Sequence, residues 1–236
     1  MVDISALAAR LAAVRDRIAA AADRARRDPA SIQLVAVSKT FPTDYVRAAA
    51  EAGQTDFGEN RVQDALRKMD EAADLAIRWH LVGHLQSNKA KKAGRFDVMH
   101  SIDSPALLQA VDAAADAAGR RVDLLVQVDL AGEPTKHGAR EDELLPIFEA
   151  AAALSAARVV GLMLLPPAVE AADAARPYFR ALRDVRQRLI DGGVEASMVR
   201  DLSMGMSHDF EVAIEEGATI VRVGTAIFGV RPRPGA

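Results

Sequence analysis

The sequence contains no cysteine in its 236 residues, and it shows neither a long hydrophobic run nor a strong excess of one charge. The missing cysteines exclude disulfide bonds, thiolate metal ligands and cysteine nucleophiles, and they fit a reducing cytoplasm. No segment has the apolar length that a membrane span or the core of a signal peptide needs. With a formal net charge of −3, the chain gives no reason to expect a nucleic-acid partner. We therefore expect a cytoplasmic protein that binds neither a membrane nor nucleic acid.

Alternating strand and helix patterns fill the chain, in which half of the residues are hydrophobic and 27% are charged. Short apolar runs predict strands at 33–39, 55–57, 77–82, 97–102, 121–130, 158–165, 197–204 and 219–223. Helical spacing and capping residues predict helices or helical turns at 43–53, 62–73, 87–94, 105–118, 141–154, 171–191, 208–216 and 226–229. A further amphipathic helix at 4–27, with Ser5 as its N-cap, precedes the first strand.

These eight strand–helix units predict a parallel sheet that closes into a single (β/α)8 barrel, or TIM barrel. The barrel would cover about residues 32–229 as one domain, and a short tail would follow at 230–236. The alternative is an open doubly wound sheet, which usually has fewer strands. In both folds, ligands bind at the carboxyl ends of the strands, so the residues there are the candidates for function.

The first strand ends on a lysine, Lys39, shortly before Pro42. Apolar surroundings favour the neutral amine of a lysine, and a neutral amine attacks an aldehyde to form a Schiff base. The alternative is a lysine that extends into water, which its flexible side chain readily does. Residues later in the chain favour the Schiff-base interpretation.

The ends of the last two predicted strands carry small and hydroxyl-bearing residues. The segment 203–207 leads into a helix, and Gly224 and Thr225 follow the last strand. Barrels often bind phosphate between these two strand ends, through backbone amides. Gly205 and Gly224 would let the backbone approach the anion, while Ser207 and Thr225 would donate from their hydroxyls. Ser207 could instead cap the following helix, a role that is compatible with phosphate binding.

Arg222 lies two residues before Gly224, so strand alternation places the two residues on the same face. A buried guanidinium needs a partner, which would be a ligand ring nitrogen or carboxylate, or else Glu215, Glu216 or a neighbouring strand. A Schiff-base lysine opposite a phosphate site predicts an aldehyde that carries a phosphate. Pyridoxal 5′-phosphate is the commonest such cofactor, and a phosphosugar bound by a lysine aldolase is the alternative.

Several longer motifs carry a specific resemblance. They are AVSKT at 36–40, FGEN at 57–60, WH at 79–80, LQSNK at 85–89, GLM at 161–163, LSMGMS at 202–207 and VGTAIFG at 223–229. In these motifs, from about residue 34 to residue 229 and in matching order, the chain resembles the pyridoxal phosphate homeostasis protein family. The resemblance implies a single barrel like the N-terminal domain of alanine racemase. It also implies a protein that binds, buffers and delivers pyridoxal phosphate, without established catalytic turnover.

The same resemblance implies the residues of the cofactor site. Lys39 matches the lysine that forms the Schiff base, and Arg222 matches the arginine near the pyridine nitrogen. Ser207, Gly224 and Thr225 match the phosphate-binding positions. The other predicted cofactor-binding residues are Asn60, His80, Met163, Ser203 and Met206. No residue is assigned to a metal or to a catalytic step.

A racemase or lyase that uses pyridoxal phosphate is the alternative function. An arginine beside the pyridine nitrogen disfavours protonation of that nitrogen, which weakens the ring as an electron sink. Such a racemase also needs a second base from another domain, which we expect this chain to lack. Its only two tyrosines, Tyr45 and Tyr178, lie in predicted helices. We therefore expect negligible racemase turnover and a monomer whose partners are pyridoxal phosphate and the apoenzymes that use it.

Two further patterns carry weaker signals. Residues 89–95, KAKKAGR, form a basic cluster. It either faces solvent, binds a second phosphate or pyridoxal phosphate, or hands cofactor to an acceptor, and a solvated face is the interpretation we favour. His80 and His84 are four residues apart, but Gly83 and a strand end separate them, so they do not predict a helical metal site. His100 and His137 have no partner motif.

Overall fold

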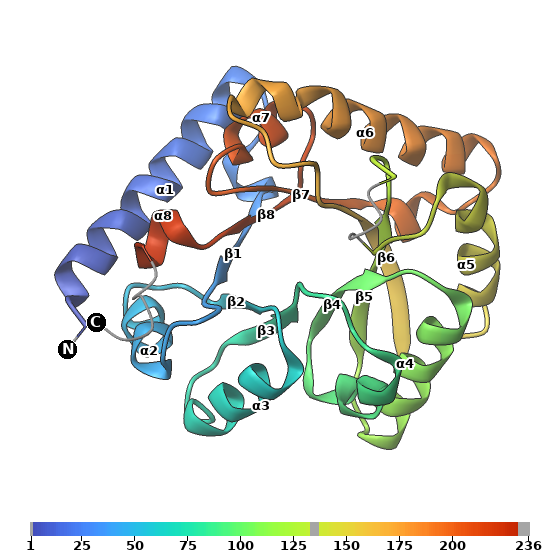
Figure 1. The fold of residues 1–236 in the computed structure, drawn as a ribbon, viewed down its shortest axis with the longest axis horizontal. Helices are drawn as coiled ribbons and strands as arrows, with labels where there is room; N and C mark the ends of the chain where they lie inside the picture. The colour runs from blue at the N-terminus through green and yellow to red at the C-terminus, as the bar shows by residue number, and fades with distance from the viewer. Residues whose placement is uncertain (1, 133–136, 231–236) are drawn as a thin grey trace.

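The computed structural model describes residues 2–132 and 137–230, except for the side chains of residues 87 and 88. Eight parallel strands in that part close into one barrel in chain order, with helices around it (Figure 1). They are β1 (Gln33–Val37), β2 (Asp56–Glu59), β3 (Arg78–Leu81), β4 (Val98–Ile102), β5 (Val122–Val128), β6 (Ala157–Leu164), β7 (Asp201–Met206) and β8 (Ile220–Val223). The (β/α)8 prediction is confirmed. The open doubly wound sheet is wrong, because β1 pairs with β8 from Gln33↔Ile220 to Ala36↔Val223.

Helices connect the strands on the outside of the barrel. The α-helices are α1 (Ile4–Arg24), α2 (Thr43–Glu51), α3 (Val62–Glu71), α4 (Pro105–Ala117), α5 (Leu144–Ala151), α6 (Arg176–Asp191), α7 (Phe210–Glu215) and α8 (Thr225–Phe228). The 3-10 helices are η1 (Pro29–Ser31), η2 (Ser87–Arg95), η3 (Glu141–Glu143), η4 (Ala172–Ala175) and η5 (Ala196–Val199). The predicted helix at 87–94 is thus a 3-10 helix, and the one at 171–191 is divided just before Pro177.

The extra N-terminal helix is present as α1, which packs against α2, α7 and α8 (Figure 1). Its buried stripe includes Leu7, Leu11 and Val14, which recur at helical spacing and seal the outside of the barrel. The predicted N-cap is wrong by two residues. The Asp3 carboxylate accepts a hydrogen bond from the backbone N–H of Ala6 (3.0 Å), so the helix already begins at Ile4.

Strand β7 differs most from the prediction, which placed a strand at 197–204. Residues 196–199 instead form η5, and the strand runs from Asp201 to Met206. Gly161 of β6 explains the register, because a Cβ at Gly161 would lie 2.1 Å from the Asp201 carbonyl oxygen. Ser203 therefore lies within the strand, and Met206 is its last residue.

The inside of the barrel is apolar in part and polar in part. Alternate residues of each strand point inward, and they form a small buried cluster that includes Val35, Leu125, Val160 and Met163. Buried polar side chains, described below, share this interior. No helix within residues 2–132 and 137–230 is long and apolar enough to cross a membrane. Of the predicted loop at 131–138 and tail at 230–236, residues 133–136 and 231–236 lie outside the described residues.

Candidate functional site

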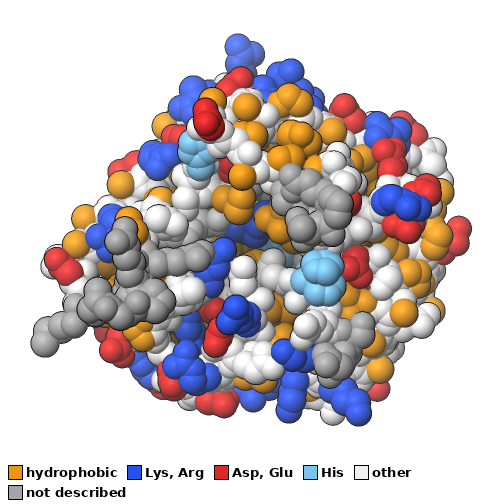
Figure 2. Space-filling view, viewed as in Figure 1, with side chains coloured by type: hydrophobic (Ala, Val, Ile, Leu, Met, Phe, Trp, Pro, Cys, Tyr) orange, Lys and Arg blue, Asp and Glu red, His pale blue; other side chains and the backbone are white. Residues whose placement is uncertain are grey.

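A cavity of about 460 Å³ opens at the carboxyl ends of the strands, which we call the carboxyl mouth of the barrel. Figure 2 shows a hollow in this face, with basic and histidine side chains around it. The volume lies in the range of small-molecule sites, about 300–1,000 Å³. The predicted site residues that line the cavity are Lys39, Asn60, Met206, Ser207, Arg222, Gly224 and Thr225. The other predicted residues, His80, Met163 and Ser203, are completely buried and are not part of the lining.

Lys39 lies two residues beyond the end of β1, in a turn whose backbone is held on both sides. The N–H of Ser38 donates to the Gly58 carbonyl (3.0 Å), and the N–H of Phe41 donates to the Ser38 carbonyl (3.1 Å). Thr40 completes the tight turn with a φ of +71°, a left-handed conformation that is uncommon outside glycine. The predicted strand was therefore two residues too long, although its lysine does line the cavity.

A buried ion pair supports this turn from inside the protein. Lys68 and Glu59 side chains are each 1% exposed, and Lys68 Nζ lies 2.5 Å from Glu59 Oε1. Lys68 Nζ also donates to the Ser38 carbonyl (2.8 Å), and Ser38 Oγ donates to Glu59 Oε1 (2.6 Å). Because a buried ion pair needs such additional hydrogen bonds to offset its desolvation, the pair and the turn depend on each other. The residue before Lys39 is thereby fixed.

Ser207 joins the ends of β7 and β8. Its hydroxyl oxygen accepts hydrogen bonds from the backbone N–H groups of Gly224 (3.1 Å) and Ala226 (3.3 Å). Ser207 does not cap the helix that follows it, because Asp209 occupies the N-cap position of α7. A hydroxyl that accepts such bonds still carries its own hydrogen, so Ser207 can donate to an anion in the cavity. Thr225 lines the same part of the cavity and brings a second hydroxyl.

The two glycines of this region have different roles. Gly205 has a φ of +92°, and a Cβ there would lie 2.6 Å from the Ala213 Cβ, so it allows β7 to pack closely on α7. It is not among the lining residues, and the expectation that it lets an anion approach is not supported. Gly224 does line the cavity, and a Cβ there would lie 3.1 Å from the Val37 carbonyl oxygen. The close approach of β8 to β1 therefore favours glycine at this position.

Arg222 extends from β8 toward the floor of the cavity and is only 4% exposed. Its Nη1 donates to Ser203 Oγ (2.6 Å), and its Nη2 donates to the Leu164 carbonyl (2.8 Å). Burial lowers the pKa of Arg222 to about 10, which leaves the guanidinium protonated at neutral pH. A guanidinium has five N–H donors and no acceptor, so it suits an occupant that accepts hydrogen bonds.

The salt bridge that the sequence left open for Arg222 is not formed. Glu215 and Glu216 pair instead with Arg176 of α6, at 2.9 and 2.7 Å. No ion pair among the described residues includes Arg222, and both of its hydrogen-bond acceptors are neutral. The carboxyl mouth therefore contains a buried cation that no carboxylate within residues 2–132 and 137–230 contacts directly.

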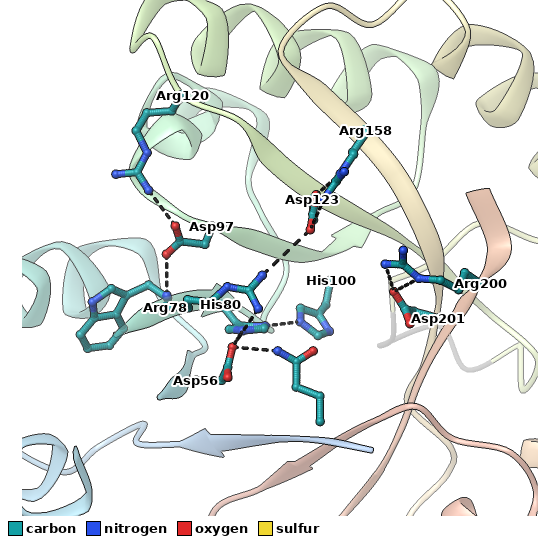
Figure 3. Close-up of polar contacts among 12 residues, drawn as sticks. Asp56, Arg78, His80, Asp97, His100, Arg120, Asp123, Arg158, Arg200 and Asp201 are labelled. Carbon is teal, nitrogen blue, oxygen red and sulfur yellow. Dashed lines mark hydrogen bonds and ion pairs between the residues drawn. The ribbon is translucent and has the colours of Figure 1, made fainter. Parts of the chain in front are cut away.

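A chain of buried hydrogen bonds continues from Arg222 through the barrel interior, and Figure 3 shows its part from His100 through His80 to Asp56. Ser203 Oγ lies 2.9 Å from His100 Nδ1, and His100 Nε2 lies 3.0 Å from His80 Nδ1. His80 Nε2 in turn lies 2.9 Å from Asp56 Oδ1. His80 and Ser203 thus lie beneath the cavity floor and connect Arg222 to the opposite end of the barrel.

One assignment of protons satisfies every bond in this chain. If both imidazoles are neutral with hydrogen on Nε2, then Arg222 donates to Ser203, Ser203 to His100, His100 to His80, and His80 to Asp56. Burial lowers the pKa of His80 and, to a greater extent, that of His100, where the charge of Arg222 also contributes. Burial alone would raise the pKa of Asp56, but its interactions with His80, Thr55 and Arg78 together outweigh this effect and lower the pKa. Neutral imidazoles between a cation and a carboxylate are therefore consistent with the geometry.

Sequence reasoning missed Asp56 and His100. Both are polar residues in short, otherwise buried strands, and both are less than 10% exposed. The alternation of inward-facing residues along β2 and β4 was the signal that could have found them. Sequence reasoning also missed that His84 and His137 meet at the carboxyl mouth, where their rings stack with centroids 3.6 Å apart. Burial lowers the pKa of His84, and the charge of His137 adds to this effect.

The basic cluster at 89–95 lies on η2 and does not line the cavity. Lys91 and Lys92 are exposed, and Arg95 forms a surface ion pair with Asp70 (2.7 Å). These placements agree with a solvated face. Tyr45, packed against Phe41 with ring centroids 4.9 Å apart, does not line the cavity either.

Comparisons with known proteins agree over nearly the whole chain. The model of the family "Alanine racemase, N-terminal domain" matches residues 9–232. The pyridoxal phosphate homeostasis protein of Aquifex aeolicus is 43% identical over 94% of this chain and 97% of its own length. The homologue of the same name in Pseudomonas aeruginosa is 42% identical over 97% of both chains. The structure of PipY from Synechococcus elongatus with PLP bound has a TM-score of 0.84 and 39% identity, covering 94% of this chain and all of that one.

Proposed function

Because the chain belongs to the pyridoxal phosphate homeostasis protein family, we propose that it binds pyridoxal 5′-phosphate at the carboxyl mouth and takes part in homeostasis of this cofactor. One observation carries the proposal. Lys39, the hydroxyls of Ser207 and Thr225, and the guanidinium of Arg222 all line the same cavity. An amine, phosphate donors and a donor for a ring nitrogen are the groups that this cofactor requires.

In this proposal Lys39 holds the cofactor covalently. Its amine would be the group that holds the cofactor through the aldehyde. The buried pair of Lys68 and Glu59 fixes the Ser38 carbonyl and hydroxyl, and so limits the positions that the Lys39 backbone can adopt. The chain thus contributes a lysine on a rigid turn rather than on a mobile loop.

The phosphate binds in this proposal between the ends of β7 and β8. Ser207 and Thr225 donate hydroxyl hydrogens to it, and the backbone at Gly224 allows a close approach. The bonds from the Gly224 and Ala226 amides to Ser207 hold the two strand ends together and orient the Ser207 hydroxyl. The donors are therefore in place before any anion binds.

Arg222 determines which chemistry the bound cofactor supports. Bound pyridoxal phosphate supplies an electron sink for amino-acid chemistry when its ring nitrogen is protonated. Arg222 has only donors to offer and a pKa of about 10, so it favours an unprotonated ring nitrogen. We therefore propose binding, buffering and delivery rather than racemase or lyase turnover. Alanine racemisation by the purified protein at a rate typical of enzymes, above about 1 per second, would contradict this part.

The proposal also covers the compartment, the oligomeric state and the acceptors of the cofactor. We propose that the protein acts in the cytoplasm as a monomer and that apoenzymes accept the cofactor from it. The cavity opens at the surface, as delivery to an acceptor requires (Figure 2). Transfer from the loaded protein to an apoenzyme, followed by recovery of that enzyme's activity, measures delivery, and light scattering measures the oligomeric state.

The decisive experiment is an absorbance titration of the purified protein with pyridoxal phosphate. We expect a visible band of the lysine-bound aldehyde in the native protein, and borohydride should fix the label on Lys39 in a peptide map. Lys39→Ala should lose the band, while the matched control Lys89→Ala, in the basic cluster, should keep it. A missing band in the native protein, or an unchanged band and label in Lys39→Ala, would contradict the proposal.

A further inference from the structure

Three side chains with metal-binding groups meet at the edge of the carboxyl mouth. His84 follows β3, Asp103 follows β4 and His137 follows β5, so three successive strands bring them together. Their nearest ligand atoms all lie within 4.8 Å of one another. Figure 2 shows histidine side chains at the edge of the hollow, next to an acidic one. His84 and His137 also line the cavity itself.

The barrel holds both histidines in place through their backbones. His84 follows Gly83, where a Cβ would lie 2.2 Å from the Asn60 carbonyl oxygen, so the chain is pressed against the end of β2. The carbonyl of His137 accepts a hydrogen bond from Gln127 Nε2 of β5. Two residues later, the N–H of Ala139 donates to the Gln127 carbonyl (2.8 Å). The two imidazoles therefore meet because their strands are fixed.

The distances in this cluster exceed hydrogen-bond length but suit a bridging ion. His84 Nδ1 lies 3.7 Å from Asp103 Oδ2, beyond the usual range of an N–H···O bond. Two ligand atoms that are each about 2.1 Å from one tetrahedral ion lie about 3.4 Å apart. Two imidazole nitrogens and one carboxylate oxygen form a donor set that Zn²⁺ and related divalent ions prefer.

We propose that His84, Asp103 and His137 bind one divalent transition-metal ion, with Zn²⁺ as the best match, at the edge of the cavity. The planes of the two stacked rings now differ by only 10°. Binding would rotate the rings out of this stack so that a nitrogen of each points at the ion. Three protein ligands leave a fourth coordination position for water or an anion. Because two of the ligands line the cavity, an anion on the metal would share the space that Lys39 faces.

The test is a metal titration of the untagged full chain after dialysis against a chelator. We expect one Zn²⁺ per chain, measured by competition with a chromophoric chelator. The variants His84→Gln, Asp103→Asn and His137→Gln should each weaken binding by at least about tenfold. Co²⁺ in place of Zn²⁺ should give visible bands of a tetrahedral site without a thiolate band, since the chain has no cysteine.

The matched control is His208→Gln. His208 lines the same cavity, but its Nε2 contacts the Glu170 carbonyl (3.0 Å) and it is not part of the cluster. We expect this variant to bind Zn²⁺ as the native chain does. Circular dichroism checks that every variant is folded, and the exposed positions of His84 and His137 favour this outcome.

Two outcomes would overturn the proposal. One is the absence of any Zn²⁺ or Co²⁺ binding to the folded native chain at about 100 μM. The other is binding that the three cluster variants leave unchanged. The titration is run first without pyridoxal phosphate, so that a failure of the proposed function cannot affect the result. It is repeated on the loaded protein, because a bound phosphate or imine would compete for the fourth position and change the Co²⁺ spectrum.

Discussion

The arginine side chains at the two mouths of the barrel differ in their burial and in their partners. At the amino mouth, formed where the strands begin, arginines and aspartates pair with one another near the surface. Arg158 pairs with Asp123 (2.5 Å) and Arg200 with Asp201 (2.7 Å), and the arginine side chains remain more than half exposed (Figure 3). At the carboxyl mouth, the guanidinium of Arg222 is buried, and its hydrogen-bond acceptors among the described residues are neutral.

In the proposed function, the buried charge of Arg222 contacts the ligand, whereas the exposed pairs at the amino mouth contact solvent. An exposed pair in water contributes little, because solvent already stabilises both ions. A buried cation without a carboxylate costs free energy unless a ligand completes its contacts. At the amino mouth, the arginines are thus paired with aspartates. At the carboxyl mouth, which contains the cavity, Arg222 has no carboxylate partner among the described residues.

The largest effect should come from the buried ion pair beneath Lys39. Replacing Lys68 by methionine leaves the Glu59 carboxylate buried without its cation, which costs about 3–5 kcal/mol of unfolding free energy. Urea denaturation measures the loss. The double variant Lys68→Met, Glu59→Gln removes the orphaned charge and should recover a large part of it. A loss below about 1 kcal/mol in the single variant would show that this pair behaves like those at the amino mouth.

The second effect is the change in affinity for pyridoxal phosphate when an arginine at one mouth or the other is replaced. Arg222→Gln removes a charged donor from the cavity and should weaken pyridoxal phosphate binding by about 10- to 100-fold, the value of a charged hydrogen bond. Arg200→Gln makes the same chemical change at the amino mouth and should leave the affinity unchanged. Equilibrium dialysis measures both variants. Equal losses in the two would mean that the contrast does not extend to binding.

The third effect is the pH dependence of stability caused by His80 and His100. The folded state lowers the pKa of both imidazoles and keeps them neutral, whereas the unfolded chain protonates them near pH 6.5. Stability should therefore be unaffected by these groups above about pH 6.5. Below it, stability should fall with pH by up to about 1.4 kcal/mol per pH unit for each group. Denaturation curves from pH 7.5 to 5 measure the slope.

Imidazole NMR shifts give an independent check on the same rings. In the folded protein at pH 6.5, at which a free imidazole is half protonated, both should keep the signature of a neutral ring with hydrogen on Nε2. The variant His100→Gln should reduce the slope of stability against pH. Protonation of either ring near pH 6.5 in the folded protein would refute the proton assignment along the chain from Arg222 to Asp56.

The smallest effect should come from the amino mouth itself. Arg158→Ala removes a side chain that is 70% exposed from its pair with Asp123. We expect a loss of about 0.2–1 kcal/mol in unfolding free energy, and a smaller one in 1 M salt, which screens exposed charges. A loss above about 2 kcal/mol would place this pair in the same class as Lys68 and Glu59.

The sequence was sufficient for the order and number of the strands, because apolar runs and helical spacing are local signals. It was also sufficient to bring Lys39, Arg222 and Thr225 to one mouth, since parallel strands in a barrel share their carboxyl end. The error in β7 arose because its register depends on the contact between Gly161 and Asp201 on two strands, which no local pattern reports.

The buried chain of hydrogen bonds was beyond sequence reasoning for a related reason. Asp56, His80 and His100 lie on the neighbouring strands β2, β3 and β4, and their register brings the side chains within 3.0 Å of one another in turn. The contact of His100 with Ser203 of β7 (2.9 Å) crosses the interior and needs the closed barrel. His84 and His137 likewise lie on separate loops and meet only in the folded structure. Contacts across a barrel depend on register and closure, whereas the sequence reports each strand separately.

The pairing of β1 with β8 has a consequence for synthesis of the protein. The strand that leads to Lys39 is made long before its partner β8, which brings Arg222, Gly224 and Thr225. A nascent chain on the ribosome therefore has no cavity of this kind until β8 has been made. Contacts so distant along the chain also form slowly. Pyridoxal phosphate would then bind only to chains in which β8 has paired with β1, and binding would stabilise these folded chains by mass action.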